Sequence, residues 1–296
     1  MTKNKNNLAN LKKMLKVAQT FNYAIPQINA NNLEWIMAIL EAANESNSPV
    51  IIGISEGAAK YMWGYKNVVD MVSNMIKFKN ITIPVALHLD HGTLNGCIAA
   101  LEAGFSSVMY DGSSLPIKEN MANTQRIVKL AKKYNASVEA EVGGIGGNED
   151  GVTSLGEFAN VGDCMDMATL DIDALAVAIG SIHGIYPKEW KSLDFNLLTQ
   201  ISELVNKPLV LHGGTGIPKD QIKRAIANGI NKINVNTECQ LAFAYATRKY
   251  IMDKKDLDVS KKGYDPRKLL KPGQEAIKIV CIEKFKEFGS FGTFKD

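Results

Sequence analysis

The sequence has no closely spaced cysteines. Its four cysteines are far apart and form no Cys-x-x-Cys pair: Cys97, Cys164, Cys239 and Cys281. A structural zinc knot and a dithiol redox motif both need such pairs, so both are disfavoured. We expect free thiols in a reducing cytosol.

Long apolar runs are also absent. The N-terminus, MTKNKNNLANLKKMLK, is polar and then amphipathic, and it has neither the apolar core nor the cleavage site of a signal peptide. No apolar run elsewhere in the sequence approaches the length of a membrane span. We therefore predict a cytoplasmic protein with no membrane partner.

Charge of one sign is not concentrated in any block. The formal net charge is +3, from 34 basic and 31 acidic residues. Lysines gather mildly near the start and over residues 254–271, where a solvated surface is the better interpretation. A nucleic-acid-binding surface would need a basic stripe with interleaved aromatic residues, so no nucleic-acid partner is expected.

The chain also lacks a linker rich in proline, glycine or serine. Hydrophobic residues make up 46% of its 296 positions, which is enough for a sizeable core and argues against disorder. We predict a single domain over residues 1–296.

Short apolar runs alternate with amphipathic stretches along the whole sequence. Eight such runs are present, at residues 23–29, 49–55, 84–90, 107–111, 137–142, 174–180, 208–213 and 232–236. Near-continuous apolar strands are typical of a parallel sheet that is covered on its faces. The repeated alternation predicts an α/β fold of the (β/α)8 barrel, or TIM barrel, type. A doubly wound open sheet is the alternative, which eight units and the lack of an early dinucleotide-binding loop disfavour.

Helical signals lie between the runs. Residues 33–45 carry apolar side chains at three- and four-residue spacing, and residues 218–229 close on Gly229, a plausible helix stop. Residues 116–135 begin with Pro116 at the expected first helical position and end in lysines, as the helix dipole favours. The stretch 255–296 is predicted to be a C-terminal helical extension whose last helix ends near residue 288.

Three of the four histidines stand at the expected ends of strands, and each is followed directly by glycine: His91, His183 and His212. The carboxyl ends of the strands hold the active site in barrels of this kind. Neutral imidazole is a common ligand of catalytic divalent metals, and three protein ligands leave a position open for substrate. The pattern predicts a metal centre, although histidines alone do not distinguish zinc from cobalt, iron or manganese.

Polar residues also stand at strand ends, one of them beside His91: Asn29, Ser55, Asp90, Asp111, Glu141 and Asn234. Asp90 directly precedes His91, where a carboxylate can act as a base toward a substrate hydroxyl beside a metal. The alternative is that Asp90 only orients a metal-bound histidine. We favour the base. His88 shares the strand face of Asp90 and is interpreted as a core residue.

Two segments after the last strands have the composition of an anion-binding site. His212 is followed by Gly213, Gly214, Thr215 and Gly216, and Asn234 begins the segment Asn-Val-Asn-Thr before an expected helix. Glycines let backbone N–H groups approach an anion, and helix starts add a positive dipole. Loops after strands seven and eight are the recurrent phosphate site of this architecture. A tight turn is the alternative, but the location favours a phosphorylated substrate.

Residues 143–151, GGIGGNEDG, form a glycine-rich segment after the fifth strand. No helix start follows the glycines at the spacing of a dinucleotide fingerprint. We interpret the segment as a mobile active-site loop that delivers an acid, Glu149 or Asp150, to the substrate. A solvent-exposed turn is the alternative.

With these residues assembled, the chain resembles the class II, metal-dependent fructose-bisphosphate aldolases. The similarity covers nearly the whole length. It includes YAIPQIN, PVIIGISEGAAKY, HLDHG, EAEVGGIGGNEDGV, GSIHGIYPK, LHGGTGIP, KINVNTE and YDPRKLLKPGQEAIK. The resemblance implies a lyase that splits fructose 1,6-bisphosphate into two triose phosphates, as in glycolysis and gluconeogenesis.

The resemblance also assigns residues. It implies zinc on His91, His183 and His212, with Asp90 as the acid/base at the hydroxyl of carbon 4. Glu149 would exchange the proton at the enediolate carbon, and Asn234 would hold the enediolate oxygen. The phosphate of the dihydroxyacetone half would lie against Gly184, Gly213, Gly214, Thr215, Asn236 and Thr237.

Further assignments concern the substrate, the ions and the assembly. Asn29 and Ser55 would face the substrate, and Arg267 would reach the other phosphate from a partner subunit of a homodimer or homotetramer. Asp111 and Glu141 match positions that some members use for a second divalent metal. Some members also need a monovalent cation, Na+ or K+, near the phosphate.

Two positions depart from the family pattern. Many members place lysine directly after the His-Gly-x-Tyr segment as a phosphate contact, whereas here Tyr186 is followed by Pro187 and then Lys188. The phosphate contact therefore either shifts to Lys188 or is lost. Asn236 stands where some fructose-bisphosphate enzymes have aspartate, which leaves tagatose-bisphosphate aldolase as a close alternative. A zinc hydrolase on the same barrel and a non-catalytic scaffold are the other hypotheses. The first commonly has a His-x-His pair on strand one, which YAIPQIN lacks, and retention of the acidic residues and histidines argues against the second.

Overall fold

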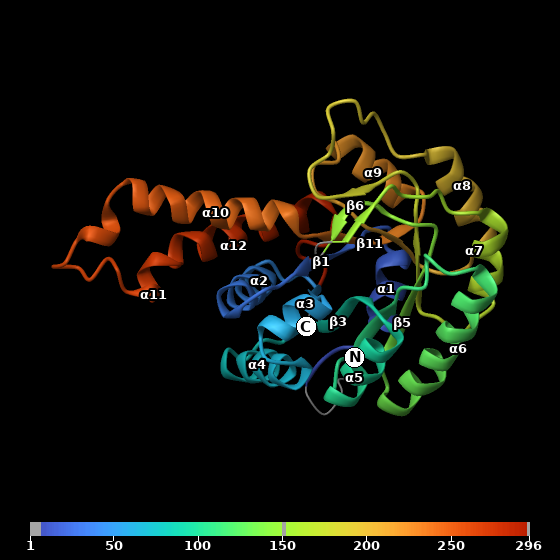
Figure 1. The fold of residues 1–296 in the computed structure, drawn as a ribbon, viewed down its shortest axis with the longest axis horizontal. Coiled ribbons are helices and arrows are strands. Elements are labelled where there is room, and N and C mark those ends of the chain that lie inside the picture. The colour runs from blue at the N-terminus through green and yellow to red at the C-terminus, as the bar shows by residue number, and fades with distance from the viewer. Residues whose placement is uncertain (1–6, 150–151, 295–296) are drawn as a thin grey trace.

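Eight parallel strands close into a barrel in the computed structural model, which describes residues 7–149 and 152–294 (Figure 1). Around the barrel they are β1 (Ile25–Asn29), β11 (Ile230–Val235), β10 (Leu209–Leu211), β8 (Ala174–Val177), β5 (Ser137–Val142), β4 (Ser107–Tyr110), β3 (Val85–Gly92) and β2 (Val50–Ile54). Each neighbouring pair runs parallel. The (β/α)8 prediction is confirmed, and the open-sheet alternative is excluded.

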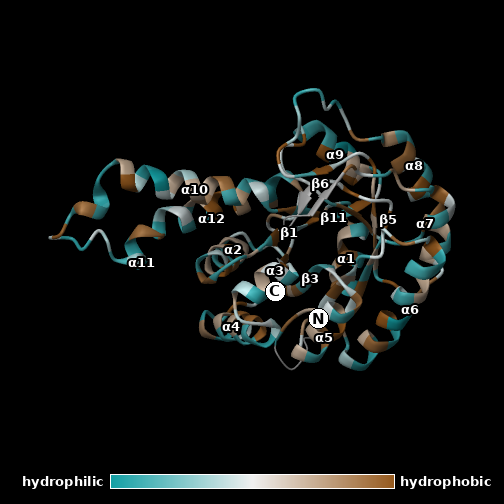
Figure 2. Ribbon diagram, viewed as in Figure 1, coloured by the Kyte–Doolittle hydropathy of each residue, from teal (hydrophilic) through white to brown (hydrophobic). Residues whose placement is uncertain are grey.

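Helices cover the outside of the barrel (Figure 1). They are α2 (Leu33–Glu45), α3 (Glu56–Tyr61), α4 (Tyr65–Phe78), α5 (Leu94–Ala103), α6 (Ile117–Tyr134), α7 (Val161–Ala168), α8 (Phe195–Leu204) and α9 (Lys219–Ala227). The C-terminal helices are α10 (Thr237–Met252) and α12 (Lys271–Glu287). Side-chain oxygens cap the first N–H groups of several, as the N-cap preference for such residues predicts: Asn32, Ser55, Thr93, Asn160 and Asp194. Figure 2 shows hydrophobic and hydrophilic bands alternating along these helices, as expected for elements with one face on the core.

One predicted helix boundary needs correction. Pro116 is the N-cap of α6, one position before the helix, with an extended ψ of 141°. Helix α9 ends at Ala227 with Asn228 as its C-cap, and Gly229 follows with a φ of +101°, so the predicted helix stop is confirmed. The predicted helix over residues 33–45 coincides with α2.

The interior of the barrel changes character from one end to the other. Helix α1 (Leu11–Thr20) closes the end where the strands begin, with Leu11, Met14, Leu15 and Ala18 in one cluster with inward-facing apolar side chains such as Ile25, Ile51, Ala86 and Val210. Beyond this apolar plug the inward residues are polar and fully buried: Gln27, His88, Glu139 and Lys232. Polar side chains in a dry interior require hydrogen-bond partners. Glu139 and Lys232 find theirs in His212 and Asn234, toward the carboxyl end of the barrel.

The C-terminal elements form an arm that projects from the barrel (Figure 1). Helices α10 and α12 lie side by side, and the turn η1 (Lys255–Leu257) and helix α11 (Pro266–Leu269) join them at the far end. Helix α12 also packs on α2, so it anchors the arm on the barrel. The predicted helical extension is therefore present.

Part of the glycine-rich segment is a strand in place of the predicted loop. Strand β6 (Gly146–Glu149) pairs with β7 (Val152–Ser154) and with β9 (Ile182–His183) to make a small separate sheet. Gly147 has a φ of +97°, and a Cβ there would lie 2.1 Å from the carbonyl oxygen of His183, so only glycine allows this approach. Asp150 lies outside the described residues, as does the side chain of Glu149.

The small sheet also corrects the placement of His183. The run 174–180 was expected to carry this histidine at its end, but β8 stops at Val177 and His183 belongs to β9. In the described part of the chain, no helix combines the length and the apolar character needed to cross a membrane.

Candidate metal centre and substrate site

An irregularity in β3 brings two consecutive side chains to the same site. Neighbouring residues of a regular strand point to opposite faces, so Asp90 and His91 should diverge. However, His91 has a φ of +47°, and the register of β3 against β4 shifts between Leu89 and Gly92. A left-handed conformation at a non-glycine residue costs about 1–3 kcal/mol and is concentrated at functional sites. Here it turns His91 toward the carboxyl end of the barrel beside Asp90.

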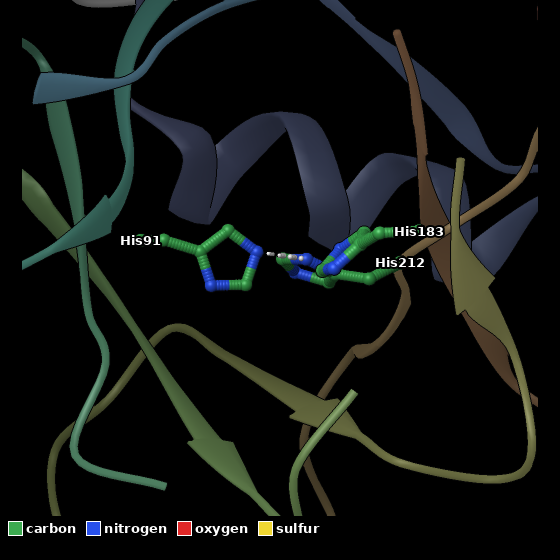
Figure 3. Close-up of side chains that lie close together, drawn as sticks. All are labelled: His91, His183 and His212. Carbon is green, nitrogen blue, oxygen red and sulfur yellow. Dashed lines mark hydrogen bonds between the residues drawn. The ribbon is translucent and has the colours of Figure 1, made fainter. Parts of the chain in front are cut away.

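His91, His183 and His212 converge at this end (Figure 3). One ring nitrogen of each lies within 4.8 Å of the others. The centroid of the His91 ring is 4.6 Å from that of His212 and 5.1 Å from that of His183. His212 Nδ1 is 2.9 Å from His91 Nε2. The three predicted metal-binding residues therefore meet, although they come from three separate parts of the chain.

Carboxylates hold the outward nitrogens of two of these rings. His91 Nδ1 is 2.8 Å from Asp111 Oδ2, and His212 Nε2 is 3.1 Å from Glu139 Oε1. A carboxylate accepts an N–H bond, so each contact fixes the tautomer that leaves the opposite nitrogen, His91 Nε2 or His212 Nδ1, with a free lone pair toward the centre. This arrangement is typical of metal-ligating histidines.

The charges around the rings also fit a cation. Burial lowers the pKa of His183 to about 3, so this imidazole is neutral, as a metal ligand must be. Burial also lowers the pKa of His91, but the hydrogen bond to Asp111 and the charges of Asp90 and Glu141 outweigh it and raise that pKa to about 10. The carboxylates thus favour positive charge at the centre. A divalent cation held by the three nitrogens would supply it.

The predicted second metal position shares a ligand with the first. His91, Asp111 and Glu141 form a second group with metal-binding geometry. His91 Nδ1 lies 2.8 Å from Asp111 Oδ2. Burial, together with the charge of Asp111, raises the pKa of Glu141 well above its usual value. Asp111 thus orients His91, and the same group also has the ligand types of a second metal site.

Two side-chain amides bracket Asp90. Asn29 Nδ2 donates to Asp90 Oδ2 at 2.9 Å, and Asn234 Nδ2 donates to Asp90 Oδ1 at 3.2 Å. Burial raises the pKa of Asp90, but His91, His212 and Lys232 outweigh it and hold the pKa well below its usual range. Asp90 is therefore an ionised carboxylate, buried to 2% exposure at the barrel mouth.

Sequence reasoning missed two charged residues beneath this site. Lys232 Nζ lies 2.8 Å from Glu139 Oε2, and both side chains are fully buried. Burial raises the pKa of Glu139, but Lys232 and His212 lower it further, to about 2. A charged residue inside an apolar strand, as in SVEAEV and KINVN, was the available signal.

A polar cradle adjoins the histidines. Nine residues line one cavity, namely Asn29, Asp90, His183, Gly184, Gly213, Thr215, Asn234, Asn236 and Thr237. The N-terminus of the 16-residue helix α10 opens here, and the buried Oδ1 of Asn236 has no hydrogen-bond partner. Tyr186 fastens the cradle, since its hydroxyl donates to Gly213 O at 2.7 Å and accepts from Ile182 N at 3.0 Å. Helix starts and glycine turns of this kind bind anions.

A wider cavity of about 450 Å³ opens on the other side of Asp90 and His183. Its lining includes Ser55, His91, Asp111, Glu141 and Gly147. The metal centre thus lies between a narrow anion cradle and a larger space. This suits a substrate with a phosphate at one end and an extended chain at the other.

The remaining predicted substrate residues lie outside the cradle. Ser55 lines the wider cavity and also caps α3, since its Oγ accepts from Ala58 N at 3.1 Å. Gly214 N donates to Asn234 O at 2.8 Å. Lys188 is exposed and does not line the cradle. Arg267 is in helix α11 at the far end of the arm, where its exposed guanidinium pairs with Asp265. The described atoms of one chain do not bring Lys188 or Arg267 to the site.

The fold and the site together define a barrel enzyme that uses a divalent metal and acts on a phosphorylated small molecule. Residues 9–293 match the family "Fructose-bisphosphate aldolase class-II". The chain belongs to this family, which is metal-dependent.

Relatives and solved structures agree with this assignment. The chain is 56% identical to the fructose-bisphosphate aldolase of Mycoplasma genitalium over 96% of its length and 98% of that protein. It is 50% identical to the fructose-bisphosphate aldolase of Geobacillus stearothermophilus, with the same coverage. The crystal structure of the YdjI aldolase from Escherichia coli K12 superposes with a TM-score of 0.82 at 30% identity, covering 97% of this chain and all of that one.

Proposed function

We propose that the protein catalyses the reversible aldol cleavage of fructose 1,6-bisphosphate into dihydroxyacetone phosphate and glyceraldehyde 3-phosphate. The observation that carries this proposal is the meeting of His91, His183 and His212 beside Asp90 and the anion cradle. The family and the names of the relatives support the reaction and its place in glycolysis and gluconeogenesis. Nothing in these comparisons favours the tagatose alternative.

The three imidazoles would hold Zn2+. When bound, the ion acts as a Lewis acid that polarises the ketone of the substrate. Asp111 and Glu139 keep His91 and His212 in the tautomers that this requires. We assign a single catalytic metal to the three imidazoles, and Asp111 and Glu141 would hold a second, non-catalytic divalent ion.

The remaining residues move protons and hold charge. Asp90, ionised and fixed by Asn29 and Asn234, removes the proton from the hydroxyl of carbon 4, and the bond between carbons 3 and 4 breaks. Asn234 then lies where its amide can donate to the enediolate oxygen. Glu149, on β6, returns a proton to the carbon and releases dihydroxyacetone phosphate.

The cradle binds the phosphate of the dihydroxyacetone half. Gly184, Gly213 and Thr215 line it, together with Asn236 and Thr237 at the start of α10. Backbone N–H groups and the helix dipole stabilise the anion there. We also propose Na+ or K+ beside this phosphate, a cytoplasmic location, and a homodimer or homotetramer in which Arg267 of the partner reaches the second phosphate.

Metal analysis combined with cleavage kinetics tests the function. Chelation should abolish triose phosphate release, and zinc or cobalt should restore it. Fructose 1,6-bisphosphate should be cleaved with a larger kcat/KM than tagatose 1,6-bisphosphate. Cleavage by metal-free protein would contradict the mechanism, a preference for tagatose would reverse the substrate, and phosphate release without triose phosphate would indicate a hydrolase.

A further inference from the structure

The carboxylate of Asp90 depends on an amide that has two ends. Asn234 Nδ2 donates to Asp90 Oδ1 at 3.2 Å. A side-chain amide has an NH2 donor and a carbonyl acceptor, whereas an ionised carboxylate only accepts. If the amide of Asn234 turned by 180° about its last torsion, two oxygens would face each other. The orientation of Asn234 therefore decides whether it stabilises or repels Asp90.

Lys232 determines this orientation. Its Nζ donates to Asn234 Oδ1 at 2.9 Å. Lys232 precedes Asn234 by two residues on β11, so both side chains point into the barrel. The ammonium group has donors and no acceptor, so the amide lies between a group that only donates and a group that only accepts. One orientation satisfies both.

Lys232 is itself held in place. Both carboxylate oxygens of Glu139 on β5 contact the ammonium group of Lys232. Its Nζ lies 3.0 Å from Oε1 and 2.8 Å from Oε2. This ion pair lies beneath the site, and the side chains of Lys232 and Glu139 are both 0% exposed. A flexible surface lysine could not fix an amide, but this one has no room to move away.

We propose that Lys232 is a positioning residue of the aldol reaction. It orients the amide of Asn234 so that the NH2 group faces Asp90 and the developing oxyanion of the substrate. The inference rests on the proposed function, because it names a residue that acts through Asn234 on that same reaction. Lys232 does not touch the substrate, so its removal should lower kcat and leave KM nearly unchanged.

A double-mutant cycle separates this role from a purely structural one. The variants are Lys232→Met, Asn234→Ala and the double variant, each assayed for cleavage of fructose 1,6-bisphosphate and for bound zinc. We expect Lys232→Met to lower kcat by about 10- to 100-fold, the effect of losing one hydrogen bond to a charged group. In the Asn234→Ala background the same change should lower kcat by less than about threefold, because the amide on which Lys232 acts is gone.

Two further variants control for misfolding and for a general packing defect. Lys232→Met leaves Glu139 as a buried charge without its lysine partner. If this single variant does not fold, the double variant Glu139→Gln/Lys232→Met is used in its place. Glutamine at 139 keeps a carbonyl oxygen for His212. Ser107→Ala is the matched control, since Ser107 is buried in the same layer and bonds His88 at 2.7 Å, and its kcat should equal that of the wild type.

The outcomes are distinct. Equal losses of kcat from Lys232→Met in both backgrounds would overturn the proposal, as would a variant with wild-type kcat. Loss of zinc from Lys232→Met would also overturn it, because Lys232 would then act through Glu139 and His212. Absence of cleavage by the wild-type zinc enzyme would instead refute the proposed function, and the control identifies a general packing defect.

Discussion

At the scale of single residues, burial and hydrogen bonding set the charge of each group at the site. His88 and His183 have lowered pKa values because burial penalises the imidazolium, while Asp90 stays ionised because His91, His212 and Lys232 outweigh its burial. The neutral imidazole of His183 suits a metal ligand, and the ionised carboxylate of Asp90 suits a neighbouring base. These states follow from the neighbours of each residue and not from its type.

Replacing Asp90 by alanine should lower kcat by about two to four orders of magnitude, the usual contribution of a general base. Zinc content should remain normal, because Asp90 bonds Asn29 and Asn234 and lies outside the three nitrogens. Cleavage kinetics and a metal assay on the purified variant check this. Asp70→Ala, on the exposed face of α4, is the control and should behave as the wild type. Loss of zinc would assign Asp90 a structural role.

His88 should make the fold sensitive to acid. Burial lowers its pKa from 6.5 to about 3, so the folded state resists a proton that the unfolded chain takes up. The stabilisation is present above pH 6.5 and is lost as the pH falls toward 3. Between pH 7 and pH 5 the loss amounts to about 2 kcal/mol. Urea unfolding of the wild type and of His88→Gln at both pH values measures it: the variant should lose less stability, and an equal loss would show that His88 titrates normally.

At the scale of secondary-structure elements, local irregularities place the functional groups. The left-handed His91 in β3, the close pairing of Gly147 with His183, and the start of α10 at the cradle all depart from regular strand geometry. Regular strands form the barrel, and these irregular positions direct side chains toward its carboxyl end. Sequence patterns predict the regular strands well because the apolar runs recur eight times, whereas a single turned residue leaves no periodic signal.

Gly53 of β2 provides space for the bracket around Asp90. A Cβ at this position would lie 2.4 Å from Asn29 Oδ1 and 2.6 Å from Gln27 Nε2. Gly53→Ala should therefore fold but displace Asn29 from Asp90, lowering kcat/KM by about 10- to 100-fold. Steady-state kinetics with thermal unfolding as a companion check this. Gly162→Ala in the exposed part of α7 is the control. Full activity of Gly53→Ala would show that Asn29 can keep its hydrogen bond to Asp90 when a methyl group is added at position 53.

At the scale of the whole molecule, the barrel and the arm have separate tasks. The barrel, closed at one end by α1, holds the metal centre, the base and the cradle. The arm carries Arg267 away from the site of its own chain and exposes apolar side chains, among them Met252, Leu257 and Val259. An arm of this kind is suited to contact another subunit, which is how Arg267 could reach a substrate.

Mixing two inactive variants tests whether Arg267 acts in a partner subunit. Asp90→Ala and Arg267→Ala should each have little activity alone. In a mixed dimer, one site combines an intact Asp90 with Arg267 of the partner subunit, so random exchange should restore about a quarter of the wild-type sites. Coupled assays after subunit exchange measure this. If Arg267 served its own chain, the mixture would stay inactive.

The sequence by itself determined the barrel, the three histidines, Asp90 and most of the cradle, because apolar periodicity and strand-end polarity are local signals. Strand boundaries at Val177 and the pairing of β6 with β9 were not predicted, since they depend on contacts between distant segments. Tertiary structure alone decided the layer of Glu139 and Lys232 and the orientation of Asn234. Those choices arise only when β5, β10 and β11 meet in a dry interior, where each buried polar atom must find its partner.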